Sequence, residues 1–84
     1  MSKPELLGWV VYRMYRGAQL NMVRALLVRT PNGRHWAYPE ESDPDQEPSA
    51  VGALSLDASD LEQQPDTPEG EHAYTYRTIL HAPQ

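Results

Sequence analysis

Runs of apolar residues separated by short polar breaks fill the first half of the chain, and they favour strands over helices. Residues 7–16 and 22–30 are rich in the β-branched and aromatic types that fit a pleated sheet. A third run, residues 34–38, follows Pro31-Asn32-Gly33, in which Asn-Gly favours a tight hairpin turn. We therefore expect residues 7–38 to form a three-stranded antiparallel meander.

The register of the first hairpin depends on the length of its loop, which we place at residues 17–21. A four-residue loop would pair Arg16 with Asn21 and set Arg13 directly opposite Arg24, where like charges repel. A loop one residue longer moves the two arginines to opposite faces of the sheet. The repulsion favours the longer loop.

Residues 50–63 allow two interpretations. A helical stripe of apolar residues (Val51, Leu54, Ala58 and Leu61) is present, but Gly52, Ser55 and Asp57 weaken a continuous helix. We favour a short strand at 51–56 followed by a helical turn at 58–63, with Ser59 and Glu62 as a capping box. The alternative is an α+β fold with a helix at 50–63.

The C-terminal part, residues 73–80, alternates Tyr and Thr with other residues and predicts a single strand. Residues 40–49 carry two prolines and no apolar side chain, so burial cannot offset the cost of ordering them. We expect a mobile acidic loop there. The chain as a whole, residues 1–84, is expected to be one mainly-β domain: a small antiparallel sheet of four or five strands with one short helical turn.

Apolar residues are unevenly spread, with 19 of the 33 positions between Leu6 and Tyr38 but only seven of the 33 between Pro39 and Glu71. The first 38 residues must therefore supply most of the core. A core this small often leaves sheet edges exposed, and self-association is one way to cover them. A homodimer is therefore possible.

Charge is also sorted by position. Residues 1–39 carry six Lys and Arg against one acid, whereas residues 40–71 carry eleven carboxylates and no Lys or Arg. The formal net charge of −5 thus hides a basic first half and an acidic middle. Each region can attract the other or an outside partner of opposite charge.

One candidate site lies in the basic part, where arginines alternate with aromatic residues. Arginine beside aromatic rings on a sheet can hold single-stranded nucleic acid through phosphate contacts and base stacking. A pI near 5.0 argues against strong nucleic-acid binding. The simpler interpretation is that the aromatic residues are core and the arginines keep the sheet soluble. The candidate contact residues are Arg13, Arg24, Arg29, Arg34, Trp36 and Tyr38.

A second candidate is the acidic segment, which could imitate the charge of a phosphate backbone and occupy a nucleic-acid-binding partner. Its composition is also typical of a solvated linker. A third option is that the segment lies over the arginines and is displaced when a partner binds, with a gain that salt would screen. The residues of this segment are Glu40, Glu41, Asp43, Asp45 and Glu47.

Catalytic and metal-binding patterns find little support. The chain has no Cys, its His residues are far apart, and the serines have no nucleophile-elbow context. Residues 25–39 resemble the strand-turn-strand that precedes the catalytic helix of Nudix hydrolases. In that family a Glu-rich, metal-binding helix with an Arg-Glu-x-x-Glu-Glu core should follow. Here residues 40–49 have prolines and no Arg, so no catalytic residue is transferred and neither a metal nor a cofactor is expected.

The sequence therefore predicts a small non-enzymatic module that binds an unidentified protein through a sheet edge or face, which needs no special motif. Weak binding of single-stranded nucleic acid and acidic mimicry of nucleic acid are the alternatives. The start of the chain shows no secretory signal, no apolar run is long enough to span a membrane, and there is no Cys. A cytoplasmic protein without a membrane partner is expected.

Overall fold

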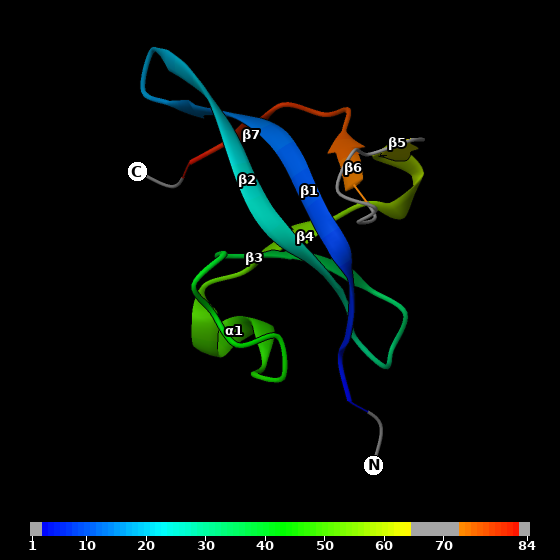
Figure 1. Ribbon diagram of the computed structural model, residues 1–84. Helices are drawn as coiled ribbons and strands as arrows, with labels where there is room; N and C mark the ends of the chain where they lie inside the picture. Colours follow the sequence, from blue (N-terminus) through cyan, green and yellow to red (C-terminus); the bar gives the residue numbers. More distant parts are fainter. Residues whose placement is uncertain (1–2, 65–72, 83–84) are drawn as a thin grey trace.

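The computed structural model describes residues 3–64 and 73–82, and it confirms a mainly-β fold (Figure 1). No helix among these residues has the length and apolar character needed to cross a membrane. The strands are β1 (Glu5–Arg16), β2 (Gln19–Arg29), β3 (His35–Tyr38), β4 (Leu54–Leu56), β5 (Leu61–Gln64), β6 (Ala73–Tyr76) and β7 (Leu80–His81). A one-turn helix, α1 (Pro48–Val51), and a 3₁₀ turn, η1 (Ala58–Asp60), complete the described elements.

The strands form one curled sheet in the order β4-β3-β2-β1-β6-β5, with β7 also beside β1. The three-stranded meander β1-β2-β3 is antiparallel, as predicted. The sheet as a whole has more strands than the expected four or five. It is also mixed, because β6 and β7 both run parallel to β1. Apolar alternation carries no information on strand direction, so the pattern could not indicate this parallel pairing.

The first hairpin turns over two residues, so the predicted loop at 17–21 is wrong. Arg16 pairs with Gln19, and Gly17 has a φ of +60°, which suits the tight turns that join twisted strands. The second hairpin has a three-residue loop, 31–33, in which Gly33 has a φ of +86°. The Thr30 N–H donates to the Arg34 carbonyl across its base at 2.9 Å.

The two-residue turn also overturns the favoured register. Val11 faces Arg24 and Arg13 faces Met22, so Arg13 and Arg24 lie diagonally on the same face of the sheet. Each of the two guanidinium groups has its own partner. Arg13 donates to the Arg77 carbonyl at 3.0 Å, and Arg24 pairs with Glu40.

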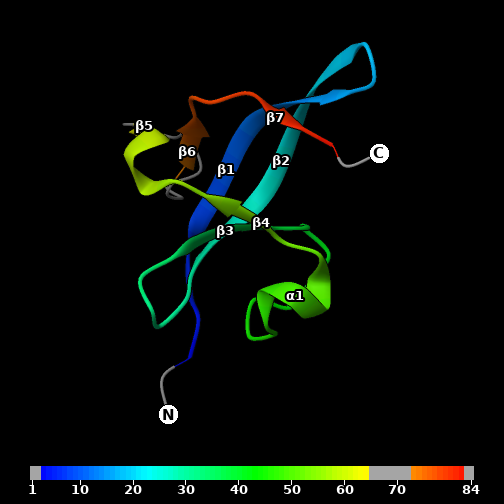
Figure 2. The same cartoon turned by 180° about the vertical axis from the view of Figure 1, so that it is seen from behind.

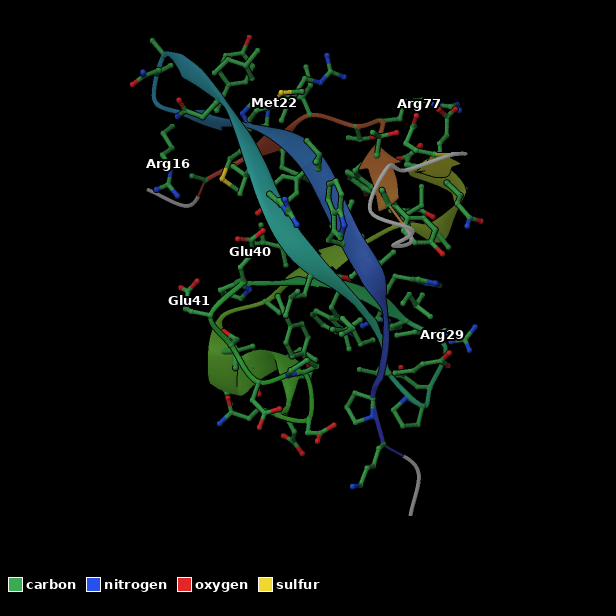
Figure 3. The ribbon with its side chains drawn as sticks, viewed as in Figure 1. Arg16, Met22, Arg29, Glu40, Glu41 and Arg77 are labelled. Atoms are coloured by element: carbon green, nitrogen blue, oxygen red, sulfur yellow. The ribbon has the colours of Figure 1, made fainter. Side chains whose placement is uncertain are left out.

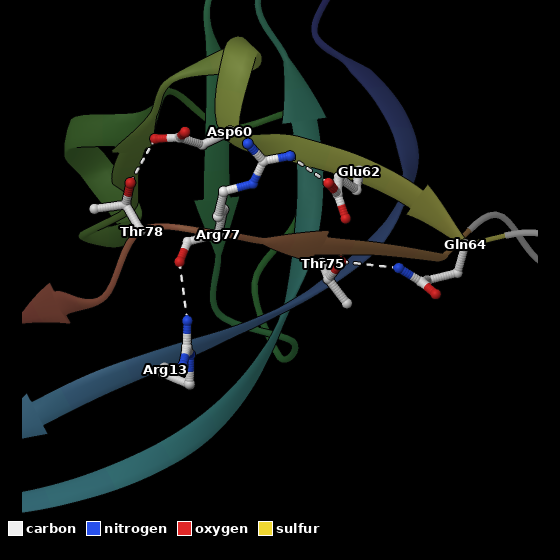
Figure 4. Close-up of polar contacts among 7 residues, drawn as sticks. All are labelled: Arg13, Asp60, Glu62, Gln64, Thr75, Arg77 and Thr78. Atoms are coloured by element: carbon white, nitrogen blue, oxygen red, sulfur yellow. Dashed lines mark hydrogen bonds and ion pairs between the residues drawn. The ribbon is translucent and has the colours of Figure 1, made fainter.

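The predicted C-terminal strand at 73–80 is interrupted after Tyr76. The Arg77 N–H donates to the Asp60 carbonyl at 2.9 Å, and the Thr78 hydroxyl donates to the Asp60 carboxylate. These bonds attach the chain to η1 and bend it away from the line of β6, while Arg77 also pairs with Glu62 (Figure 4). The chain then meets β1 again as β7.

Between β3 and β6, the favoured order of a strand followed by a helical turn is confirmed, and the alternative helix at 50–63 is wrong. Both elements are shorter than the predicted 51–56 and 58–63, because Val51 belongs to α1 and residues 61–63 belong to β5. The capping box is also wrong: the Asp57 carboxylate caps η1 by accepting from the backbone N–H and hydroxyl of Ser59. These bonds lower the pKa of Asp57. Helix α1 was not expected, although it has Pro48 at its start and Gly52 in the left-handed conformation at its end.

The main core lies on one face of the sheet. It comprises Val10, Tyr12, Met14, Ala25, Leu27, Ala37, Leu56 and Tyr76. Val28 and Tyr38 are also fully buried but lie outside this cluster. The Tyr38 hydroxyl donates to the Gln46 carbonyl at 2.6 Å, which ties the segment after β3 to the sheet. Both views place α1 at the end of the molecule away from the tip of the β1–β2 hairpin (Figures 1 and 2).

Candidate functional site

One long side of β2 is open. The strand pairs with β1 along its whole length, but β3 covers only Leu26–Arg29. Within residues 3–64 and 73–82, no strand pairs with the other side of residues 19–25. Figure 1 shows this part of the hairpin projecting beyond β3. We call residues Gln19–Ala25 the open edge. It presents the unpaired backbone groups that allow a further strand to add.

The hairpin register determines which residues of the open edge direct their backbone groups outward. A two-residue turn makes its flanking residues, Arg16 and Gln19, a pair that exchanges hydrogen bonds with each other. Along β2, the backbone N–H and C=O groups of successive residues then point alternately toward β1 and away from it. The N–H and C=O groups of Leu20, Met22 and Arg24 therefore point away from β1, toward the open side.

A groove of about 520 Å³ runs beside the open edge on the core face of the hairpin. Val23 and Ala25 of β2 line it together with Leu54 of β4. Tyr12 and Met14 of β1 also line it. The groove thus offers apolar contacts directly beside unpaired backbone groups. Its charged lining residues are Arg16, Arg24, Glu40 and Glu41.

Tyr12 gives the groove a polar contact. Its hydroxyl has no hydrogen bond within the described part of the chain. No fully buried side-chain N or O atom among those residues lacks a partner, so this hydroxyl reaches solvent. Burial raises the pKa of Tyr12, and the positive charge of Arg16 opposes that rise. Tyr12 is therefore a neutral hydrogen-bonding group in the groove at physiological pH.

The opposite face of the hairpin carries an apolar and cationic surface. The Arg24 guanidinium lies 4.0 Å from the centre of the Trp9 ring, and its Nε contacts Glu40 at 2.7 Å. Met22 is 75% exposed and Leu20 is 44% exposed, both on the open edge. Exposed apolar side chains on an unpaired strand are an aggregation risk unless something covers them.

The residues predicted for nucleic-acid contact are spread over several local interactions. Arg13 binds a backbone carbonyl, Arg29 pairs with Glu5 at 2.6 Å, and Arg24 stacks on Trp9. Tyr38 is fully buried. The other two predicted residues follow the second turn: Arg34 is exposed, and Trp36 of β3 is half-buried and donates to the Thr30 hydroxyl.

Among the described residues, the acidic segment forms one ion pair with the candidate arginines: Glu40 contacts Arg24, and both side chains are about half exposed. Asp43 forms a local turn by accepting from the Asp45 N–H, and the Gln46 N–H donates to the Asp43 carbonyl. Glu41, Asp45 and Glu47 are exposed. The mobility of this loop stays a prediction. In the part of the chain that the structure describes, no group of three or more acidic or His side chains is placed to hold a metal ion.

Comparisons with known proteins give no relative from which a function could be inferred. The chain matches no family model, no curated protein and no solved structure.

The open edge was not identified from the sequence, although two signals for it are present. Gly17-Ala18 fits a two-residue turn with Gly in its first position. Pro39 ends the returning strand early, which leaves the apolar run of β2 longer than its partner β3. Together these signals predict an uncovered stretch of β2 next to the first turn.

Proposed function

We propose that this chain is a non-enzymatic protein-interaction module that binds an extended segment of a partner protein along the open edge. The observation that carries the proposal is the combination of the unpaired side of Gln19–Ala25 with the groove of apolar and charged side chains beside it. In strand addition, backbone hydrogen bonds supply affinity and the neighbouring groove selects alternate side chains. Both parts are present on the same side of β2.

Nucleic-acid binding fits this surface less well. Stacking requires open aromatic faces next to free cations. The Arg24 guanidinium already occupies one face of Trp9, Tyr38 is buried, and Arg29 is paired with Glu5. Acidic mimicry needs carboxylates at fixed spacing, and Glu40 is engaged by Arg24. We therefore favour strand addition over nucleic-acid binding and over acidic mimicry of nucleic acid.

The proposal is tested by titrating two capped heptapeptides into isotope-labelled protein and following the backbone amides by NMR. One peptide is Lys-Thr-Val-Thr-Val-Thr-Glu, and the other has its two charged ends exchanged. Seven residues match the length of the open edge. With at least one peptide, we expect the largest shifts at Leu20, Met22 and Arg24 at millimolar concentration or below.

The matched control is a peptide with Pro in place of the central Thr, and the matched variant is Met22→Pro. Each removes a backbone donor from the new ladder, so each should abolish the shifts. If neither heptapeptide moves these amides, strand addition at the open edge is wrong. Shifts centred instead on Trp9 and Leu26 would also contradict it, because they would indicate binding to the outer face of the sheet.

A further inference from the structure

We propose that the partner segment runs antiparallel to β2 and carries a basic residue at its N-terminal end and an acidic residue at its C-terminal end. This inference rests on the proposed function, and it adds the direction and the charge pattern of the segment that the open edge accepts.

The direction follows from β3. Strand β3 runs antiparallel to β2 and pairs Tyr38 with Leu26, after which Pro39 ends the strand. A new strand on the open edge would continue the line that β3 leaves, and antiparallel pairing is slightly more stable per residue than parallel pairing. The N-terminal end of such a segment lies beside Ala25, and its C-terminal end lies beside Gln19.

The charge pattern follows from the two ends of the groove. Arg16 lines it next to the hairpin turn, and Glu41 lines it at the end where the chain leaves β3. In the described part of the chain neither side chain has an ion-pair partner. Glu40 lies at the same end as Glu41, but Arg24 largely balances its charge.

The placement of these two charges is visible in Figure 3. Both side chains lie on the same side of the β1–β2 hairpin, Arg16 nearer its tip and Glu41 beside the segment that follows β3. An antiparallel segment therefore brings its N-terminal end to the carboxylate and its C-terminal end to the guanidinium. A basic N-terminal residue and an acidic C-terminal residue complement both.

The groove determines the residues in between. Alternate side chains of an added strand point toward opposite faces of the sheet. On the groove side they meet Val23, Met14 and Leu54, so apolar side chains fit there. On the other side they lie beside the exposed Met22 and Arg24, where small polar residues suffice. The partner segment thus alternates apolar and polar residues between its charged ends.

The experiment compares the dissociation constants of the two heptapeptides that differ only in the exchange of their charged ends. We expect Lys-Thr-Val-Thr-Val-Thr-Glu to bind at least about fivefold more tightly at low salt, and the ratio to approach one at about 1 M salt. A spin label on its N-terminal end should broaden the amide signals of Glu41 and Ala25 more than that of Gln19. The double variant Arg16→Gln and Glu41→Gln should remove the preference, whereas Arg34→Gln with Asp45→Asn should keep it.

Each outcome decides one of the two proposals. Equal binding of both peptides, or tighter binding of the exchanged peptide, overturns the charge and direction but leaves strand addition standing. Absence of binding by both peptides overturns the proposed function itself. If the free protein sediments as a dimer that Met22→Pro dissociates, the occupant is a second copy of this chain, and the charged segment proposed here is wrong.

Discussion

Arg16 and Gln19 face each other across a two-residue turn, and this pairing sets the register of the β1–β2 hairpin from the turn to the Gly8–Leu27 pair. It determines that Leu20, Met22 and Arg24 direct their backbone groups outward, whereas Asn21 and Val23 direct theirs toward β1. The pattern of outward backbone groups on the open edge is therefore a consequence of one turn.

Proline substitution at neighbouring positions of β2 should have very different effects on stability. Met22→Pro removes an N–H that has no partner in the sheet, so the fold should tolerate it. Val23→Pro removes a hydrogen bond to β1 and should lower the free energy of unfolding by several kcal/mol. Urea denaturation of both variants measures the difference. Equal destabilisation by the two prolines would show that this register is wrong.

Replacing Tyr38 with Phe should loosen the acidic segment without unfolding the sheet. The lost hydroxyl donates to the Gln46 carbonyl from a fully buried ring, so unfolding should become easier by about 1–2 kcal/mol. Amide exchange in residues 40–47 should accelerate. Tyr15→Phe is the matched control, since its hydroxyl has no hydrogen bond within the described residues. A Tyr38→Phe variant as stable as Tyr15→Phe would refute this role.

The fold should depend strongly on Leu27. This side chain is fully buried in the main core, and Leu27→Ala should lower the free energy of unfolding by about 2–5 kcal/mol. Small domains have about 5–15 kcal/mol in total, so the variant should be close to unfolding. Leu20→Ala removes the same atoms from a 44% exposed position and should change stability by about 0.5 kcal/mol or less. Thermal or urea denaturation tests the contrast.

His35 should make stability depend on pH near neutrality. Burial and the nearby positive charge of Arg29 lower the pKa of His35 below its usual value of about 6.5. The unfolded chain therefore takes up the proton first. The stability that neutral His35 contributes is fully present above its pKa in the unfolded chain. It is lost as pH falls toward its lower pKa in the folded protein.

Urea denaturation from about pH 8 down to about pH 5.5 should show this loss, and His35→Gln should reduce the slope. An NMR titration of the His35 ring measures its pKa directly. A folded-state value at or above the usual one would contradict the interpretation.

The class of fold was accessible from the sequence because alternation and turn residues are local signals. The β2–β3 hairpin followed from Pro31-Asn32-Gly33, and the order of a strand and then a turn, predicted at 51–56 and 58–63, followed from weak helical residues such as Gly52. The parallel contact between β1 and β6 was not accessible, since it joins segments far apart in the chain. Residue patterns within a strand do not specify its neighbour's direction.

The candidate site was accessible only in part. The sequence indicated binding at a sheet edge but did not identify the edge. The five-residue loop proposed for the first hairpin gave a wrong register, so the outward-facing residues of β2 could not be identified. Arg24 illustrates the remaining difficulty. Its contacts with Trp9 and Glu40 depend on tertiary placement, so the same residue suggested nucleic-acid contact by its type alone. Register and distant partners, rather than composition, determine what this surface can bind.

Residue-resolved hydrogen exchange of the free protein, repeated with the Lys-Thr-Val-Thr-Val-Thr-Glu peptide, tests the open edge most directly. In the free protein we expect fast exchange at Leu20, Met22 and Arg24 and protection at Asn21 and Val23. Added peptide should protect the three fast amides and leave the other two unchanged. Protection of all five in the free protein, or no new protection with peptide, would contradict the account.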